Sequence, residues 1–469
     1  MTKVESMKVG QRLPRGEIDF STNLCGLLVF VAVVVLLVLN GAQTMAITGY
    51  LANLSGLPLD VTTVACLIAV LTSIATVVAI DLVVFRRQSA QGAEAGPRQR
   101  QTIAFGRIAV KLLALYAAFG MAWIVYSSFS EYGEFYGRFF NALALVLPFI
   151  LVLAVPYFVL VDRFMADPED GYHHFGRYLL GLVAGRRRYP YDWRYVYDFA
   201  MGWVVKFFFL PLMFSYLTYE VDRLAAFDVA TMFETQSGLY DFLYSFLYGV
   251  DLVFATCGYI MTLKLTNSHI KSTDPTLLGW LVCIVCYQPF ASIVFEQYLN
   301  YDDGFFWGAW LFANPVLYVA WAAAIIALIG IYTLASVSLG FRFSNLTYRG
   351  LATSGPYRFT KHPAYISKNL SWWLISIPFI PNGDVLQAAK LCLLMFGVNV
   401  LYFLRARTEE NHLSNYPEYV AYADWMNEYG MFAWLGRIVP FFRYSETRAK
   451  HARSVVWWRK AQPEAVAIR

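Results

Sequence analysis

Residues 24–46, with the sequence LCGLLVFVAVVVLLVLNGAQTMA, form an apolar run that contains no charged side chain. A helix needs about 20 consecutive apolar residues to cross a bilayer, so this run predicts a membrane-spanning helix. The apolar core of a secretory signal peptide has about 7–15 residues, so we expect this longer run to be retained. The composition agrees, because 58% of the residues are hydrophobic and 15% are charged, against about 25% charged residues in soluble proteins.

Nine further apolar stretches of span length follow, most of them separated by short polar links. The ten candidate spans cover residues 24–46, 61–85, 107–129, 139–161, 195–217, 239–263, 277–294, 309–336, 363–381 and 385–404. We therefore expect an all-α polytopic integral membrane protein with about ten transmembrane helices. The stretch 277–294 contains Pro289 and is the candidate most at risk of being re-entrant.

Lysine and arginine are concentrated in every second loop and in both terminal tails, whereas the alternate loops hold only Arg138 and Arg223. By the positive-inside rule, both termini and the basic loops lie in the cytoplasm. This distribution accounts for the net charge of +5 without a nucleic-acid partner. We expect an integral protein of a bacterial inner membrane, in contact with membrane lipids; the sequence leaves its oligomeric state open.

Ionisable residues inside spans are functional candidates, because a charge is costly in the hydrocarbon core. Four qualify: Asp81, Lys206, Asp251 and Lys368. Asp251 lies deepest and is our candidate for a substrate-binding residue; the alternative is that these groups pair with one another or reach the interface. The six cysteines lie in apolar runs without a set of metal-ligand pairs, so we expect no metal site.

The segment GPYRFTKHPAY, residues 355–365, joins the eighth and ninth candidate spans. A residue before proline avoids the α region and proline favours the first helical position, so a helix should start at Pro363 with His362 as its cap. The helix N-terminus, together with Arg358 and Lys361, predicts a polar pocket for an anionic group. The alternative is an ordinary basic loop that contacts lipid headgroups.

A second polar segment, RTEENHL at residues 407–413, follows the tenth candidate span and precedes PEYVAY at 417–422. If the helix continues past Leu404, Arg405 and Glu409 share one face at i,i+4 spacing. The turn Pro381-Asn382-Gly383-Asp384 makes the last two candidate spans an antiparallel hairpin. Both segments should therefore meet at the cytoplasmic end of the hairpin; a solvated helix end with salt bridges is the alternative for the second segment alone.

Together the two segments resemble the isoprenylcysteine carboxyl methyltransferase family and its phospholipid methyltransferase relatives. Members of that family carry a G-P-Y-R-x-x-R-H-P-x-Y linker and an R-x-E-E-x-x-L element. The likeness is confined to the C-terminal part of the chain, and Lys361 stands where the family usually has arginine. Lysine keeps the charge but loses the bidentate fork, which weakens any role of this position as a carboxylate clamp.

The resemblance implies an S-adenosylmethionine-dependent methyltransferase whose acceptor is a lipid or a lipid-modified group with a carboxylate, hydroxyl or amine. It implies a cytoplasmic catalytic site formed by the C-terminal helices. Six residues would bind the cofactor: Tyr357, Arg358, His362, Pro363, Tyr365 and Glu409. Arg407 and Glu410 would be the catalytic pair that orients the acceptor, although the roles of Glu409 and Glu410 could be exchanged. An amine or hydroxyl acceptor would let Glu410 or His412 act as a general base.

The expected organisation has four parts. A cytoplasmic tail covers residues 1–23, an eight-span region with the acceptor chamber covers 24–336, the cofactor-binding module covers 337–430, and a basic cytoplasmic tail covers 431–469. The identity of the acceptor does not follow from the sequence, because the recognisable motifs lie on the cofactor side.

Two other functions fit parts of the sequence. The sterol reductases share the C-terminal fold, have ten spans and use NADPH, but they carry a cysteine after their R-D-E element and in their tail, and none follows Glu410. A transporter or lipid-binding scaffold would use Asp81, Lys206 and Asp251 as a polar pathway. That alternative predicts repeated pairs of broken helices, which are not evident.

Overall fold

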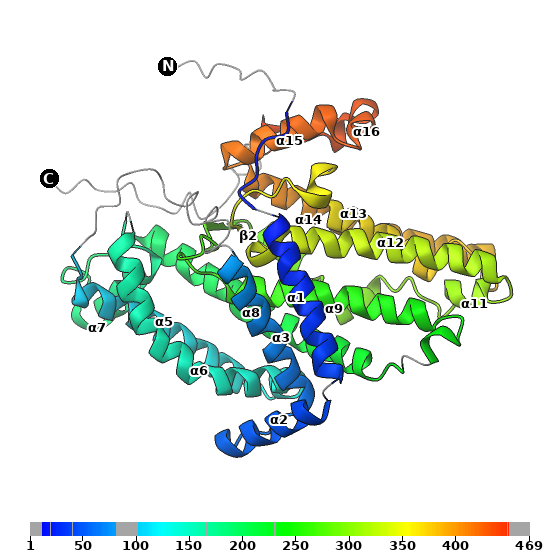
Figure 1. The fold of residues 1–469 in the computed structure, drawn as a ribbon. Coiled ribbons are helices and arrows are strands. Elements are labelled where there is room, and N and C mark those ends of the chain that lie inside the picture. Colours follow the sequence, from blue (N-terminus) through cyan, green and yellow to red (C-terminus); the bar gives the residue numbers. More distant parts are fainter. Residues whose placement is uncertain are drawn as a thin grey trace.

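The computed structural model of the chain describes residues 12–447 and 449, apart from residues 19, 40, 81–101, 166 and 229–230. The described residues are mostly helical (Figure 1). The α-helices are α1 (Phe20–Leu39), α2 (Gly41–Ser55), α3 (Val61–Ile80), α5 (Phe105–Ser127), α6 (Glu131–Phe164), α7 (Gly171–Ala184), α8 (Trp193–Ala225), α9 (Gly238–Ile260), α10 (Leu277–Ile284), α11 (Trp307–Leu311), α12 (Pro315–Leu339), α13 (Pro363–Ser376), α14 (Val385–Leu413), α15 (Pro417–Tyr429) and α16 (Ala433–Ile438). Short helical turns are η2 (Thr231–Phe233), η3 (Ser292–Tyr298), η4 (Gly340–Arg342), η5 (Gly355–Arg358) and η6 (Pro440–Phe442), and two short strands are β1 (Ser272–Thr273) and β2 (Thr347–Tyr348).

Seven helices in the described part of the chain are long and apolar enough to cross a membrane, namely α3, α5, α6, α8, α9, α12 and α14. This agrees with the expected class, an all-α polytopic membrane protein. The membrane-spanning helix predicted over 24–46 is not continuous, because α1 ends at Leu39 and α2 continues at an angle of 92°. Gly41, Gln43 and Thr44 interrupt the apolar run there, and glycine is a poor helix former. Counting this bent pair as one span gives up to 8 spans.

Two other candidate spans also form shorter helices than expected. In the stretch 277–294, α10 has 8 residues, and the chain becomes helical again only after Pro289, with η3 from Ser292. Helix α13 has 14 residues. At about 1.5 Å per residue, neither reaches the thickness of the hydrocarbon core, about 30 Å. The expected count of ten transmembrane helices is therefore not confirmed.

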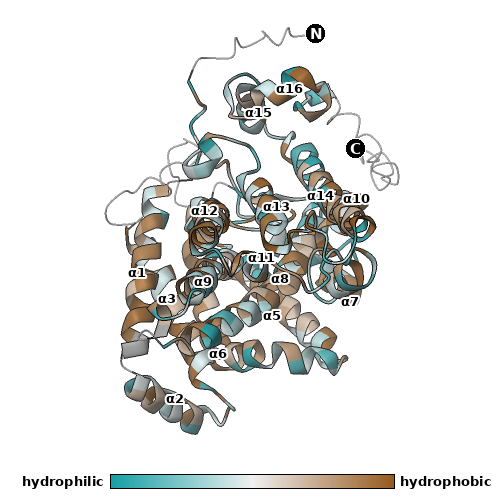
Figure 2. Ribbon diagram, turned by 90° about the vertical axis from the view of Figure 1, so that its right-hand side faces the viewer, coloured by the Kyte–Doolittle hydropathy of each residue, from teal (hydrophilic) through white to brown (hydrophobic). Residues whose placement is uncertain are grey.

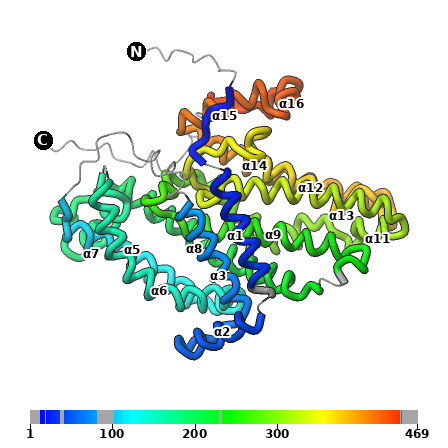
Figure 3. The backbone as a smooth tube through the Cα atoms, in the orientation of Figure 1, coloured from blue at the N-terminus to red at the C-terminus, as the bar shows by residue number. Residues whose placement is uncertain are grey.

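The helices are arranged in three groups (Figures 1 and 3). Helices α5, α6 and α7 lie on one side, α12, α13 and α14 lie on the other, and α1, α3, α8 and α9 lie between them. The largest apolar core lies in the middle group, around Phe209, Leu212 and Tyr259. Hydrophobic residues run along the long helices, as Figure 2 shows. Helices α15 and α16 lie at one end of the molecule, beyond the ends of α13 and α14 (Figure 1).

Three segments that are distant in sequence meet at this end. Strand β1 pairs antiparallel with β2, so that Ser272 lies opposite Tyr348. The backbone N–H of Glu17 donates to the carbonyl of Leu351 at 2.8 Å, and the Glu17 carboxylate accepts from Lys271 at 2.9 Å. The beginning of the described chain, the segment before α10 and the linker before α13 therefore form one connected layer.

Candidate active site at the end of the C-terminal hairpin

Helices α13 and α14 form the antiparallel hairpin that the sequence predicts. Helix α13 starts at Pro363, as expected, and its N-cap His362 has φ −128° and ψ 55°. The His362 side chain does not cap the helix. Polar side chains join the two helices, because Asn399 accepts from the Trp373 indole at 2.8 Å and donates to Asn369 at 2.6 Å. The hairpin thus brings the GPYRFTKHPAY and RTEENHL segments to the same end.

The linker before α13 packs tightly between α12 and α15. Gly355 has φ +58°, in the left-handed region that favours glycine, and a side chain at this position would overlap the hydroxyl of Ser338 in α12. The carbonyl of Tyr357 accepts a hydrogen bond from the Tyr422 hydroxyl of α15 at 2.7 Å. The first contact explains why the GPYR segment needs glycine at its first position, and the second ties the linker backbone at Tyr357 to α15.

Arg349 anchors the beginning of the linker to the end of α9. Its side chain is 2% exposed, and its guanidinium donates to four backbone carbonyls. These carbonyls belong to Gly258, Met261, Ser268 and Phe343, and each accepts at 2.8–2.9 Å. The carbonyls at a helix C-terminus carry partial negative charge, so a cation is stabilised there. The sequence alone places Arg349 in one of the basic loops that set the topology and indicates no other role for it.

A small open pocket lies where α14, α13, the linker, α10 and the segment before α10 meet. Its lining residues are mostly polar: Asp274, Gly279, Cys283, Ser344, Asn345, Leu346, Thr347, Tyr365, Arg405, Thr408, Glu409 and His412. The Tyr365 hydroxyl donates to the Glu409 carboxylate at 3.0 Å. Arg405 is buried, donates to Asn345 at 3.2 Å and lies 5.1 Å from the Tyr365 ring centre. Arg405 and Glu409 therefore share one helix face, as their spacing predicts.

Glu410, the next residue, faces away from this pocket and into a cluster of cations. Its carboxylate lies 2.5 Å from the Lys361 ammonium, 3.2 Å from His362 Nε2 and 2.8 Å from the Arg407 guanidinium. Arg407 also donates to the carbonyls of Arg443 and Phe441. Of the two linker cations expected to attract an external anion, Lys361 is thus already paired with a carboxylate of the protein itself, whereas Arg358 is exposed.

Comparison with known families gives a result for this region. Residues 316–415 match the model of the isoprenylcysteine carboxyl methyltransferase (ICMT) family. The match confirms the resemblance seen in the two motifs and supports a membrane methyltransferase in the broad sense. No curated protein and no solved structure matches the chain. The ICMT-matched region contains nearly all of α12, the linker, α13 and α14.

Only some of the cofactor-binding residues that the ICMT resemblance predicts lie at the pocket. Tyr365 and Glu409 line the pocket. His362 lies beside it, 4.0 Å from Glu409 and 3.2 Å from Glu410. Pro363 is buried at the start of α13, the backbone carbonyl of Tyr357 accepts from Tyr422 of α15, and Arg358 is exposed on the linker. The arrangement brings two of the six predicted cofactor-binding residues into the pocket; their function stays a prediction.

Part of the pocket wall comes from outside the ICMT-matched region, and the sequence alone does not predict these residues as part of the site. Asp274, just before α10, and Gly279 and Cys283, within α10, line the pocket. This segment is tied to α14 by the hydrogen bond between Ser272 and His412 Nε2, at 2.8 Å. Only long-range packing reveals it, because Asp274 lies in a short polar loop that carries no motif of its own.

The ionisable residues expected inside spans lie away from the pocket or outside the described residues. Asp251 is buried in α9 and accepts hydrogen bonds from Tyr332, at 2.7 Å, and from Ser336. The Lys206 ammonium donates to Thr262 at 3.1 Å, and Lys368 lies 5.0 Å from the Tyr332 ring centre. Asp81 lies outside the described residues. A substrate-binding role for Asp251 stays a prediction.

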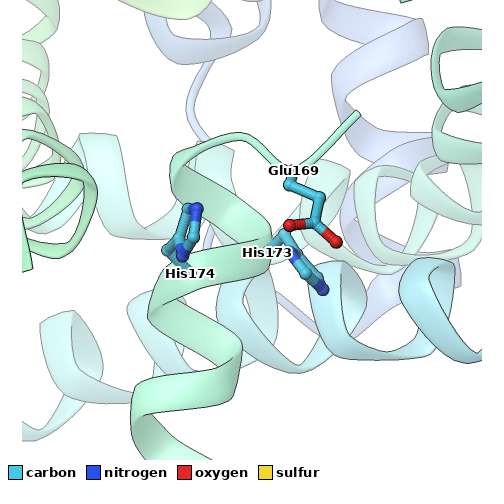
Figure 4. Close-up of side chains that lie close together, drawn as sticks. All are labelled: Glu169, His173 and His174. Atoms are coloured by element: carbon cyan, nitrogen blue, oxygen red, sulfur yellow. The ribbon is translucent and has the colours of Figure 1, made fainter. Parts of the chain in front are cut away.

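One group of side chains elsewhere in the described chain has metal-ligand chemistry. Glu169, His173 and His174 lie at the start of α7, with one ligand atom of each within 4.8 Å of the others (Figure 4). Zinc bonds of about 2.1 Å require ligand atoms about 3.4 Å apart. His174 Nδ1 already accepts from the Asp192 backbone at 3.1 Å. The group is separate from the pocket, and we assign no function to it.

Proposed function

We propose that the protein is an S-adenosylmethionine-dependent methyltransferase that modifies a lipid or a lipid-modified acceptor. The observation that carries this proposal is the pocket in which the ICMT-matched hairpin places Arg405 and Glu409 next to Tyr365. A buried guanidinium and carboxylates around one pocket suit a ligand with both negative and positive groups. The bound cofactor would supply an electrophilic methyl group on its sulfonium.

The pocket residues have distinct roles in this proposal. Glu409 is the carboxylate of the predicted Glu409–Glu410 pair that contacts the cofactor, and Tyr365 fixes its orientation through their hydrogen bond. Arg407 and Glu410 act as positioning residues, since their side chains hold α14 against the linker and the chain after α16. Such a site needs little acid–base chemistry, because most of the acceleration comes from holding acceptor and methyl donor in line.

The helices before residue 316 would contain the acceptor. A lipophilic acceptor would enter from the bilayer between the helices, while the polar cofactor arrives from the aqueous side. We infer that this aqueous side is the cytoplasm, because lysine and arginine are concentrated in the loops on that side. We assign the acceptor chamber to the region 24–336 and the cofactor module to 337–430, except that Asp274, Gly279 and Cys283 also line the cofactor pocket.

Ligand-dependent thermal stability tests this function. We expect S-adenosylhomocysteine, added to the purified protein in detergent, to raise its melting temperature, because a ligand that binds only the folded state stabilises it by about 2.7 kcal/mol at 100 times its dissociation constant. NADPH should leave the melting temperature unchanged. Stabilisation by NADPH and not by S-adenosylhomocysteine would reject the methyltransferase and favour a reductase.

Substitutions at the pocket give a second test. We expect Glu409→Gln to lower the affinity for S-adenosylhomocysteine at least tenfold, since it removes the charge and keeps the shape. Tyr365→Phe should have a smaller effect, because one hydrogen bond contributes about 1 kcal/mol. Isothermal titration calorimetry measures both. The control is Glu234→Gln, at an exposed glutamate in the segment before α9; wild-type affinity in Glu409→Gln would place the cofactor site elsewhere.

A further inference from the structure

Asp274 is a buried carboxyl group that the ICMT-matched region does not contain. It lies between β1 and α10, is 2% exposed and lines the same pocket as Glu409. Its Oδ1 accepts from the backbone N–H and the hydroxyl of Thr276, at 2.8 Å and 2.7 Å. The other oxygen, Oδ2, packs against Gly279, where a Cβ would overlap it. The first turn of α10 is therefore built around this carboxylate.

The surroundings of Asp274 favour an additional positive group. The pKa of Asp274 is raised to about 6, because burial outweighs the Thr276 hydrogen bonds that lower it and the nearby Glu409 carboxylate adds to the rise. Among the described residues, no cation forms an ion pair with Asp274. A buried carboxylate beside a second one is stabilised when a cation is bound between them.

The opposite charge is present in the same pocket. Arg405 is 5% exposed, and its guanidinium donates to the amide oxygen of Asn345 at 3.2 Å. A guanidinium is suited to a carboxylate, with which it can form two parallel hydrogen bonds. Two carboxylates and one guanidinium around one pocket thus match the charges of an α-amino acid, which carries an ammonium and a carboxylate.

We propose that Asp274 and Glu409 bind the α-ammonium group of the cofactor's amino-acid end, and that Arg405 faces its carboxylate. This inference rests on the proposed function and extends it, because one of the two ammonium-binding residues comes from outside the ICMT-matched region. The segment before α10 is then part of the cofactor site, and Gly279 is required to leave room for the carboxylate.

Two ligands that differ in the amino-acid end test this assignment. S-adenosylhomocysteine carries that end, and 5′-methylthioadenosine lacks it. We expect Asp274→Asn to lower the affinity for S-adenosylhomocysteine at least tenfold and to leave the affinity for 5′-methylthioadenosine within twofold of the wild type. Isothermal titration calorimetry of the full-length protein in detergent measures both, and the melting temperature without ligand verifies folding.

A second variant guards against loss of folding in Asp274→Asn. Gly279→Ala should displace the carboxylate through the added Cβ, although alanine is the better helix former at this position in α10. We expect the same selective loss of S-adenosylhomocysteine affinity. If 5′-methylthioadenosine binds the wild type too weakly to measure, the affinity for S-adenosylhomocysteine alone decides.

The outcomes separate the two proposals. Wild-type affinity for S-adenosylhomocysteine in both variants would overturn the role of Asp274 and leave the methyltransferase proposal standing. An equal loss of both ligands would also overturn it, since Asp274 would then act on the shape of the pocket. A wild-type protein that binds neither ligand would overturn both proposals.

Discussion

Replacing Glu410 with glutamine is expected to lower the free energy of unfolding by about 3–5 kcal/mol, the usual cost of removing one partner from a buried ion pair. Glu410 is 4% exposed, and its carboxylate contacts Lys361, His362 and Arg407. The amide of glutamine cannot neutralise this cluster, and the cations stay buried. The melting temperature of the variant in detergent, compared with that of the wild type, measures the effect.

The neighbouring glutamate provides the matched control. The Glu409 side chain is 45% exposed and belongs to the pocket. We expect Glu409→Gln to melt close to the wild type while it loses affinity for S-adenosylhomocysteine. The double variant Lys361→Met/Glu410→Gln should recover part of the lost stability, because it also removes one buried cation. Equal melting temperatures for Glu410→Gln and the wild type would show that the cluster does not stabilise the fold.

Replacing Arg349 with methionine is expected to lower the free energy of unfolding by at least about 3 kcal/mol, since each buried polar group left without a partner costs about 1–3 kcal/mol. The variant leaves the carbonyls of Gly258, Met261 and Ser268 without their guanidinium donor. It also frees the linker from the end of α9. We therefore expect a lower melting temperature together with weaker binding of S-adenosylhomocysteine.

The control for this variant is Arg358→Met, at an exposed arginine of the same linker. It should melt like the wild type. Arg349→Lys should be intermediate, because an ammonium supplies donors but cannot reach all of the carbonyls that the planar guanidinium joins. A wild-type melting temperature in Arg349→Met would mean that water or the backbone replaces the lost hydrogen bonds.

Local sequence rules predicted the elements around the site well. Pro363 begins α13 because proline suits the first helical position, and the turn at 381–384 folds α13 back against α14. The i,i+4 spacing placed Arg405 and Glu409 on one face, and both line the pocket. These features depend on neighbours within a few residues, so the sequence contains all the information that they need.

The same rules failed where helix length depended on more than apolar composition. Residues 24–46 read as one span, yet the chain turns by 92° after α1. The stretch 277–294 breaks after Ile284, and α13 stops at Ser376. Apolar composition records a preference for lipid or for a protein core, but it does not fix where a helix ends. The prediction of ten spans counted these three stretches together with the seven stretches that do form helices long and apolar enough to cross a membrane.

The sequence by itself determined that the protein belongs in a membrane, that its last two long apolar segments form a hairpin and that two polar motifs meet at one end of it. Apolar composition and local turn chemistry are sufficient for these features. Only the tertiary structure decided that Glu409 lines the pocket while Glu410 pairs with Lys361, and that Asp274 belongs to the same pocket as Arg405. Those relations join residues far apart in the chain, such as Ser272 and His412, and they arise from how the helices pack.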